Sequence, residues 1–173
     1  MANVTDALKQ GMNTEIWGKC FYEEAVARTS SEDGKRIFQS LVDEEAKHLD
    51  ILRGQYAALS EDDEYVSVED AIAMADSVDP ADIFPEAAMA GQLIPDDATD
   101  EQALEMAMEF ERQGYKLYQS AASEAKDDSE REMWEYLAEA EDYHYAFLQE
   151  THEYLTNEGK WYFDERELPF FEG

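Results

Sequence analysis

Glutamate and histidine recur in this sequence at spacings that suit metal coordination. Each of two segments contains a glutamate and, 30 residues later, a Glu-x-x-His motif. The candidate metal ligands are Glu15, Glu45, His48, Glu111, Glu141 and His144. Residues three apart lie on the same face of a helix, so the glutamate and histidine of each motif can point toward one site. The pattern predicts that helices bring four carboxylates and two imidazoles together.

The neighbours of these residues indicate what such a cluster would bind. Leu41, Leu52, Leu137 and Leu148 lie near the same helical stripes, so we expect the cluster to be buried. Buried charges without partners are costly, whereas two divalent cations would neutralise four carboxylates and occupy the imidazole lone pairs. Carboxylate and imidazole together suit iron or manganese. We expect two iron ions, with manganese or a mixed pair as alternatives. A decayed site of hydrogen-bonded core residues is the competing interpretation, and the intact ligand set argues against it.

The two motifs belong to an internal duplication. A shift of 96 residues aligns Ala7-Leu8 with Ala103-Leu104 and, without a gap, Leu52 with Leu148. We therefore predict a single domain over residues 1–173. Its parts are repeat 1 (about 5–59), a crossover connection (about 60–99), repeat 2 (about 100–156) and an aromatic C-terminal tail (157–173).

Apolar periodicity and capping residues predict four long helices, two in each repeat. The first covers residues 5–29, and the second follows the turn residues around Ser31. Capping boxes predict a short helix after Ser67 and the start of the third long helix at Thr99, and Asp127 opens the fourth. Prolines exclude a long helix between residues 60 and 99. The predicted fold is all-α: a four-helix bundle of two helical hairpins joined by a long crossover.

Two further pairs of residues recur at matched positions of the repeats. Tyr22 and Tyr118 lie two helical turns beyond Glu15 and Glu111, so their hydroxyls could hydrogen-bond ligand carboxylates, although core packing explains them nearly as well. Gly18 and Gly114 are costly in a helix interior. They indicate close helix packing or, as the alternative, a space for an exogenous ligand.

The composition restricts the partners. The chain has 43 acidic and 13 basic residues and a net charge of -30, which repels phosphate backbones and anionic lipids. We therefore expect neither nucleic acid nor a membrane as a partner, and a solvated, salt-adapted surface is the simplest explanation of the charge. The single cysteine, Cys20, excludes a disulfide within the chain and a cluster held by several cysteines. With no apolar run long enough for a bilayer and no secretory pattern at its start, we expect a cytoplasmic protein.

The repeated Glu and Glu-x-x-His pattern resembles that of the rubrerythrin and ferritin-like di-iron carboxylate proteins over nearly all of residues 5–156. The resemblance implies a left-handed bundle with bridging carboxylates from Glu45 and Glu141. It also implies terminal ligands from Glu15, His48, Glu111 and His144. The sequence departs from the rubrerythrins at Gly114, where they usually carry a further ligand glutamate, and it has no rubredoxin domain.

The resemblance implies redox chemistry on peroxide or dioxygen. Our first hypothesis is a non-haem di-iron oxidoreductase that reduces one of these substrates with electrons from an external donor, and we expect a homodimer. A second hypothesis is oxidation of ferrous iron for iron storage or detoxification. A third, of another class, is a protein in which the metals are structural and the aromatic tail binds a partner.

Overall fold

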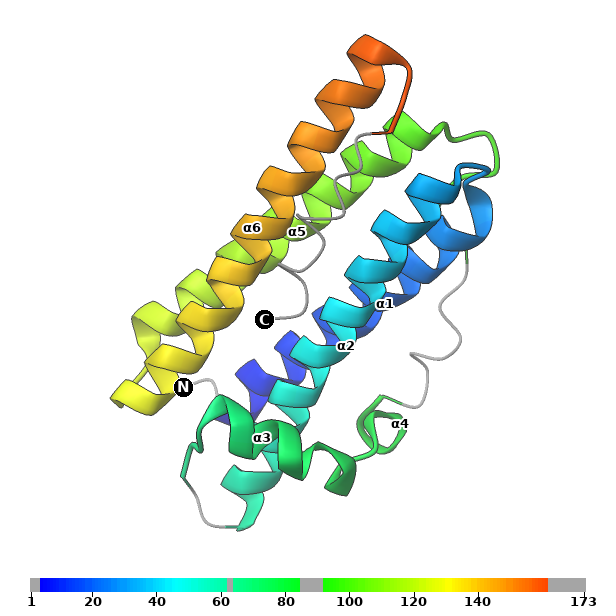
Figure 1. The fold of residues 1–173 in the computed structure, drawn as a ribbon. Helices are drawn as coiled ribbons and strands as arrows, with labels where there is room; N and C mark the ends of the chain where they lie inside the picture. Colours follow the sequence, from blue (N-terminus) through cyan, green and yellow to red (C-terminus); the bar gives the residue numbers. More distant parts are fainter. Residues whose placement is uncertain (1–3, 62–63, 85–91, 162–173) are drawn as a thin grey trace.

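The computed structural model describes residues 4–61, 64–84 and 92–161, and within these ranges the secondary structure is entirely helical (Figure 1). The four long helices are α1 (Val4–Arg28), α2 (Glu32–Glu61), α5 (Asp100–Glu124) and α6 (Asp128–Glu158). Their number and order confirm the prediction of an all-α bundle with two long helices in each repeat.

The helix starts follow from local hydrogen bonds. Thr99 and Gln102 form the predicted capping box: the Gln102 N–H donates to Thr99 Oγ1 over 3.2 Å, and the Thr99 N–H donates to Gln102 Oε1 over 3.0 Å. Asp127 accepts from the Glu130 N–H at the start of α6. The Gly34 N–H donates to Ser31 Oγ at the start of α2. These contacts satisfy N–H groups that the first turn of a helix leaves without partners.

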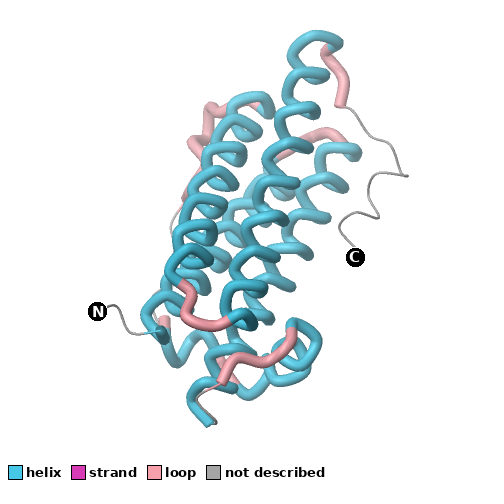
Figure 2. Tube along the Cα trace, turned by 90° about the vertical axis from the view of Figure 1, so that its left-hand side faces the viewer, coloured by secondary structure: helices cyan, strands magenta, loops and turns pink. Residues whose placement is uncertain are grey.

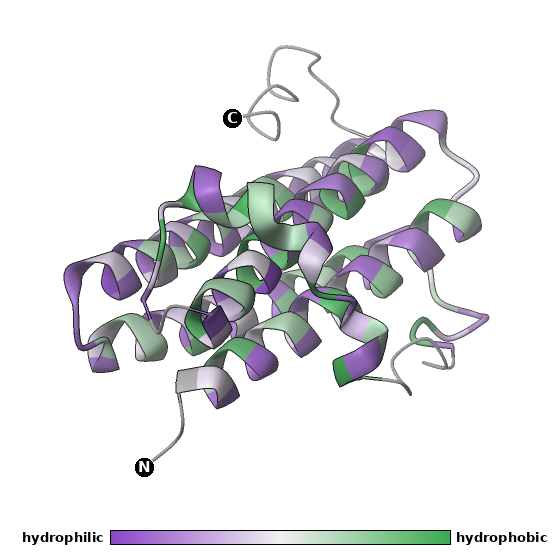
Figure 3. Ribbon diagram, turned by 90° about the horizontal axis from the view of Figure 1, so that it is seen from below, coloured by the Kyte–Doolittle hydropathy of each residue, from purple (hydrophilic) through white to green (hydrophobic). Residues whose placement is uncertain are grey.

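The long helices form two antiparallel hairpins. Helix α1 packs along α2, and α5 packs along α6, while α1 and α5 make the closest contact between the hairpins (Figures 1 and 2). Hydrophilic and hydrophobic positions alternate along each long helix (Figure 3), as expected for helices that bury one face. In the described part of the chain, no helix combines the length and apolarity that crossing a membrane requires.

The connection between the hairpins starts with short helices at the end of α2. These are α3 (Val68–Met74), the 3-10 helix η1 (Ala75–Ser77) and α4 (Pro80–Ile83). Ser67 caps α3 as predicted, whereas α4 was not foreseen. Helix α3 lies directly on α2 at Gly54, where a Cβ atom would come within 1.7 Å of the Ala71 carbonyl oxygen. Glycine is therefore required at this crossing.

The connection then returns to the opposite end of the bundle (Figure 1). The Glu24 carboxylate accepts hydrogen bonds of 2.9 Å from the Leu93 and Ile94 N–H groups. The Arg28 guanidinium donates to the Pro95 carbonyl. These contacts start α5 beside the end of α1, so the two helices run in opposite directions and their equivalent positions meet at the middle of the bundle.

Two apolar clusters fill the ends of the bundle. One includes Phe21 and Phe38, near the turn between α1 and α2, and the other includes Leu8, Trp134 and Leu137 at the opposite end. The polar candidate ligands occupy the layer between these clusters. Of the predicted tail, residues 157 and 158 continue α6, Trp161 packs on Phe38 with ring centroids 5.5 Å apart, and residues 162–173 lie outside the described part.

Candidate metal centre

The structure brings all six candidate ligands together in the middle layer. Helices α1 and α5 supply one glutamate each, and α2 and α6 supply one Glu-x-x-His pair each. The six residues are 0 to 3% exposed: Glu15, Glu45, His48, Glu111, Glu141 and His144. The site therefore lies in the interior, where its charges depend on one another more than on water.

Three groups of side chains could each hold a metal ion: one joins Glu44 to the two histidines, and the other two, described next, share two carboxylates. Glu15, Glu45, His48 and Glu141 offer one set, in which the ligand atoms lie within 4.8 Å of one another. Glu45, Glu111, Glu141 and His144 offer the second set. Each set could hold one cation, and Glu45 and Glu141 belong to both.

Each histidine presents its Nδ1 atom to carboxylates. His48 Nδ1 lies 3.1 Å from Glu141 Oε1 and 3.5 Å from Glu15 Oε2. His144 Nδ1 lies 3.3 Å from Glu111 Oε2 and 3.6 Å from Glu45 Oε1. Each ring thus faces a glutamate of the other Glu-x-x-His motif. The two rings stack with centroids 5.5 Å apart and an interplanar angle of 15°, so the two halves of the site are nearly symmetrical.

Tyr22 and Tyr118 contact the site across the hairpin interface. The Tyr22 hydroxyl donates a hydrogen bond to Glu111 Oε1, and the Tyr118 hydroxyl donates one to Glu15 Oε1. Each tyrosine therefore orients a glutamate of the opposite repeat rather than of its own helix. Burial, followed by the charges of nearby glutamates, raises the pKa of both tyrosines well above the ordinary value, so both remain protonated donors.

Several buried polar atoms of the cluster make no hydrogen bond of regular geometry. They are Glu15 Oε2, Glu45 Oε1, both ring nitrogens of His48, and Glu141 Oε1. Buried polar atoms are normally satisfied, so a group of them without hydrogen bonds at one point is a suitable donor set for a cation. A metal ion would accept lone pairs from these oxygen and nitrogen atoms. The donor set therefore fits a cation held by carboxylates and imidazole.

The titration behaviour also indicates an excess of negative charge. Burial, and then the charges of neighbouring glutamates, raise the pKa of Glu45 and Glu141 well above the ordinary value. Burial raises the pKa of Glu15, but hydrogen bonding to Glu45 and the charge of His48 outweigh it, and the net pKa is lowered. Burial lowers the pKa of His144, yet the Glu111 carboxylate outweighs it and raises the net value. Without cations, the cluster therefore retains protons to limit its charge.

Gly18 and Gly114 lie directly against the shared carboxylates. A Cβ atom on Gly18 would lie 2.8 Å from Glu45 Oε2, and one on Gly114 would lie 2.6 Å from Glu141 Oε2. The glycines thus make room for the two glutamates that both ligand sets share. The contacts favour the close-packing interpretation of the two glycines, and the space for an exogenous ligand stays a prediction.

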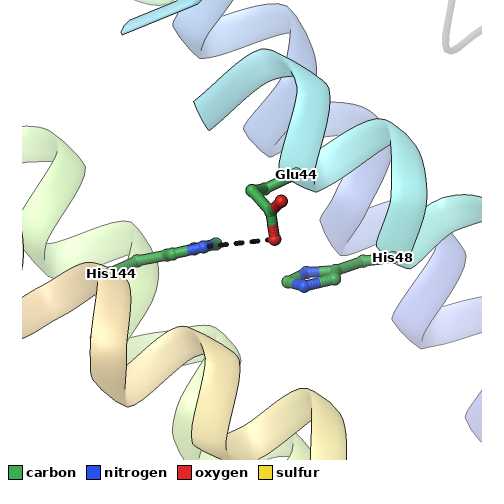
Figure 4. Close-up of side chains that lie close together, drawn as sticks. All are labelled: Glu44, His48 and His144. Atoms are coloured by element: carbon green, nitrogen blue, oxygen red, sulfur yellow. Dashed lines mark ion pairs between the residues drawn. The ribbon is translucent and has the colours of Figure 1, made fainter. Parts of the chain in front are cut away.

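A seventh residue of the cluster, Glu44, was missed from the sequence. Figure 4 shows its carboxylate beside the rings of His48 and His144, with Glu44 Oε2 4.0 Å from His144 Nε2. Burial raises the pKa of Glu44, which is 7% exposed. The signal available in the sequence was its place one helical turn before His48. The repeat gave no such signal, because the equivalent position is Ala140.

No protein-family model, curated protein or solved structure matches this chain. The case for a function therefore rests on the buried cluster. It shows that four glutamates and two histidines on four helices could hold a metal ion.

Proposed function

We propose that this chain is a ferritin-like, rubrerythrin-like di-iron oxidoreductase that reduces peroxide or dioxygen with electrons from an external donor. The observation that carries the proposal is the pair of ligand sets that share Glu45 and Glu141. Two redox-active cations held by these residues would supply the chemistry that reduces an O–O bond.

The residues have distinct roles in this proposal. Glu45 and Glu141 would be shared by the two cations, Glu15 and His48 would hold one of them, and Glu111 and His144 would hold the other. Tyr22 and Tyr118 hold the terminal glutamates in place through their hydrogen bonds. When bound, iron supplies the electrons for O–O bond reduction, and the protein supplies orientation and a dry interior.

Glu44 marks the side from which a small oxidant would enter. It is 7% exposed, whereas the six ligands are 0 to 3% exposed, so Glu44 is the most solvent-exposed residue of the cluster. Its carboxylate also lies beside the Nε2 atom of His144, on the side of the ring away from the Nδ1 contacts. At 4.0 Å this contact is longer than a hydrogen bond, but the negative charge of Glu44 would favour a proton on Nε2 and leave Nδ1 for a metal.

Anaerobic loading with ferrous iron tests the proposal. The loaded protein is mixed with peroxide and, separately, with air, and optical spectra are recorded before and after re-reduction with a chemical donor. Repeated oxidation cycles with two irons retained per chain support the proposal. Continuous consumption of added ferrous iron with mineral formation would replace it by iron oxidation for storage. Bound metal that reacts with neither oxidant would indicate a structural role. Glu45→Ala with Glu141→Ala serves as the variant without bridging carboxylates.

A further inference from the structure

A line of aromatic rings connects the candidate metal centre with the surface. Tyr118 donates its hydrogen bond to Glu15 and stacks on Trp134, with ring centroids 5.7 Å apart and an interplanar angle of 21°. Tyr65, which is half-buried, packs against the same apolar cluster as Trp134. Its hydroxyl donates a hydrogen bond of 3.3 Å to Glu130 Oε1. Each of the two tyrosine hydroxyls in this line therefore donates a hydrogen bond to a carboxylate.

Trp134 and Tyr65 are neighbours within this apolar cluster. Burial and the Glu130 carboxylate raise the pKa of Tyr65, and the Trp134 side chain opposes this shift as a hydrogen-bonding neighbour. The indole N–H nevertheless makes no hydrogen bond of regular geometry, although Trp134 is only 1% exposed. A buried indole usually finds a partner for its N–H, and the polar side chain that neighbours the indole here is Tyr65.

The first repeat contains an equivalent line with one decisive difference. The 96-residue shift relates Tyr118 to Tyr22, Trp134 to Phe38, and Tyr65 to Trp161. Tyr22 and Phe38 stack with centroids 6.2 Å apart at 29°, and Phe38 meets Trp161 at 5.5 Å. Phenylalanine fills the central position without an N–H group, which shows that the fold does not need tryptophan there.

The difference is chemical. Tyrosine and tryptophan can lose one electron to a strong oxidant, whereas the phenylalanine ring has no comparably accessible oxidised state. The line through Phe38 therefore has no readily oxidised ring at its centre, whereas every ring of the line through Trp134 can be oxidised. We propose that Tyr118, Trp134 and Tyr65 form a one-electron relay between the carboxylate–histidine cluster and the surface at Tyr65.

Each step of the relay balances in electrons and protons. Tyr118 gives one electron to an oxidant at the cluster, and its phenol proton moves to Glu15. Trp134 then returns an electron to Tyr118, which recovers its proton. Tyr65 reduces Trp134 while its own proton moves to Glu130, and an external one-electron donor restores Tyr65. The natural oxidant of the relay would be the oxidised metal pair, so in this respect the relay rests on the proposed function. The test of the relay does not, because it needs no iron.

Photo-oxidation from the surface tests the relay without iron. Glu64 and Lys160 are exposed, immediately precede Tyr65 and Trp161, and are related by the same 96-residue shift. In a Cys20→Ser background, Glu64→Cys or Lys160→Cys carries a ruthenium polypyridyl photosensitiser, and a soluble cobalt(III) complex serves as quencher. The full-length chain is used metal-free and zinc-loaded, and radicals are followed by transient absorption and by electron paramagnetic resonance after freezing.

We expect the label at position 64 to produce a long-lived tyrosyl signal, part of which requires Tyr118. Tyr118→Phe and Trp134→Phe should each remove the part of the signal that comes from Tyr118 and leave only the tyrosyl signal of Tyr65. The label at position 160 should oxidise Trp161 and produce no tyrosyl signal that depends on Tyr22. Circular dichroism checks that the variants fold, and Trp134→Phe reproduces the packing of the first repeat.

A Tyr118 signal that survives Trp134→Phe, or equal inner tyrosyl yields from the two labels, would overturn the relay. These results would leave the proposed function untouched, because no iron takes part. Conversely, if the chain fails to oxidise iron but the photo-oxidation experiment gives the expected signals, the proposed function is refuted and the relay is retained.

Discussion

Replacement of Glu141 by glutamine should stabilise the metal-free protein and remove the stabilisation by metal. Glutamine preserves the size of the side chain and one carbonyl acceptor, and it removes the charge. Glu141 is 3% exposed and belongs to both ligand sets. One substitution therefore acts on the repulsion among the carboxylates and on both metal positions.

The magnitude in the metal-free protein follows from proton linkage. Burial and the charges of Glu111 and Glu15 raise the pKa of Glu141 in the folded state. The folded state then holds a proton that the unfolded chain releases above a pKa of about 4.3, so stability falls by about 1.4 kcal/mol per pH unit until the folded pKa is reached. At pH 7 this cost is at most about 4 kcal/mol. Glu141→Gln should therefore raise the free energy of unfolding of the metal-free protein by this amount at pH 7 and change it little near pH 4.5.

The magnitude in the loaded protein follows from mass action. A ligand that binds only the folded state at 100 times its dissociation constant stabilises by about 2.7 kcal/mol, so two metals contribute about 5 kcal/mol. In a protein of this size, that corresponds to a rise in Tm of roughly 10 to 20 °C. Because Glu141 serves both sets, Glu141→Gln should lose most of this gain.

Urea unfolding followed by circular dichroism, with chelator or with excess manganese(II), measures both effects at pH 5 and pH 7. Glu139→Gln is the matched control, because it removes the same formal charge from an exposed position of α6. Equal effects of Glu141→Gln and Glu139→Gln without metal would refute the electrostatic reasoning. Equal stabilisation of wild type and Glu141→Gln by metal would refute the shared ligand.

Three further perturbations test the site. Wild type should bind two metal ions per chain and Glu45→Ala with Glu141→Ala none; elemental analysis that finds a single ion in wild type would exclude the paired site. Gly114→Ala should lower the stability of the metal-loaded protein by about 1 to 3 kcal/mol, because the added Cβ would lie 2.6 Å from Glu141 Oε2. Calorimetry measures this loss, and an unchanged Tm would contradict the close contact. Glu44→Gln should weaken metal binding about 10 to 100-fold in competition with a chromogenic chelator, if its carboxylate orients His144, and unaltered affinity would remove it from the site.

The sequence alone determined the features that depend on neighbouring residues. Capping at Thr99 and Asp127 is a local hydrogen-bonding property, so the starts of α5 and α6 were predictable. The prolines identified residues 60–99 as the connection, because proline excludes a long helix whatever the tertiary structure around it. The shift of 96 residues identified the two Glu-x-x-His motifs as equivalent, and helical spacing placed each motif on one face.

Only the tertiary structure decided how the two repeats meet. The crossing of Tyr22 to Glu111 and of Tyr118 to Glu15 depends on the contact between α1 and α5, which no spacing within one helix specifies. The carboxylate against Gly114 depends equally on the rotation of α6 about its axis. Glu44 was missed because its partner His144 lies 100 residues away and its repeat counterpart is alanine. Contacts between distant segments are set by packing of whole helices, and local residue patterns do not encode their relative rotation.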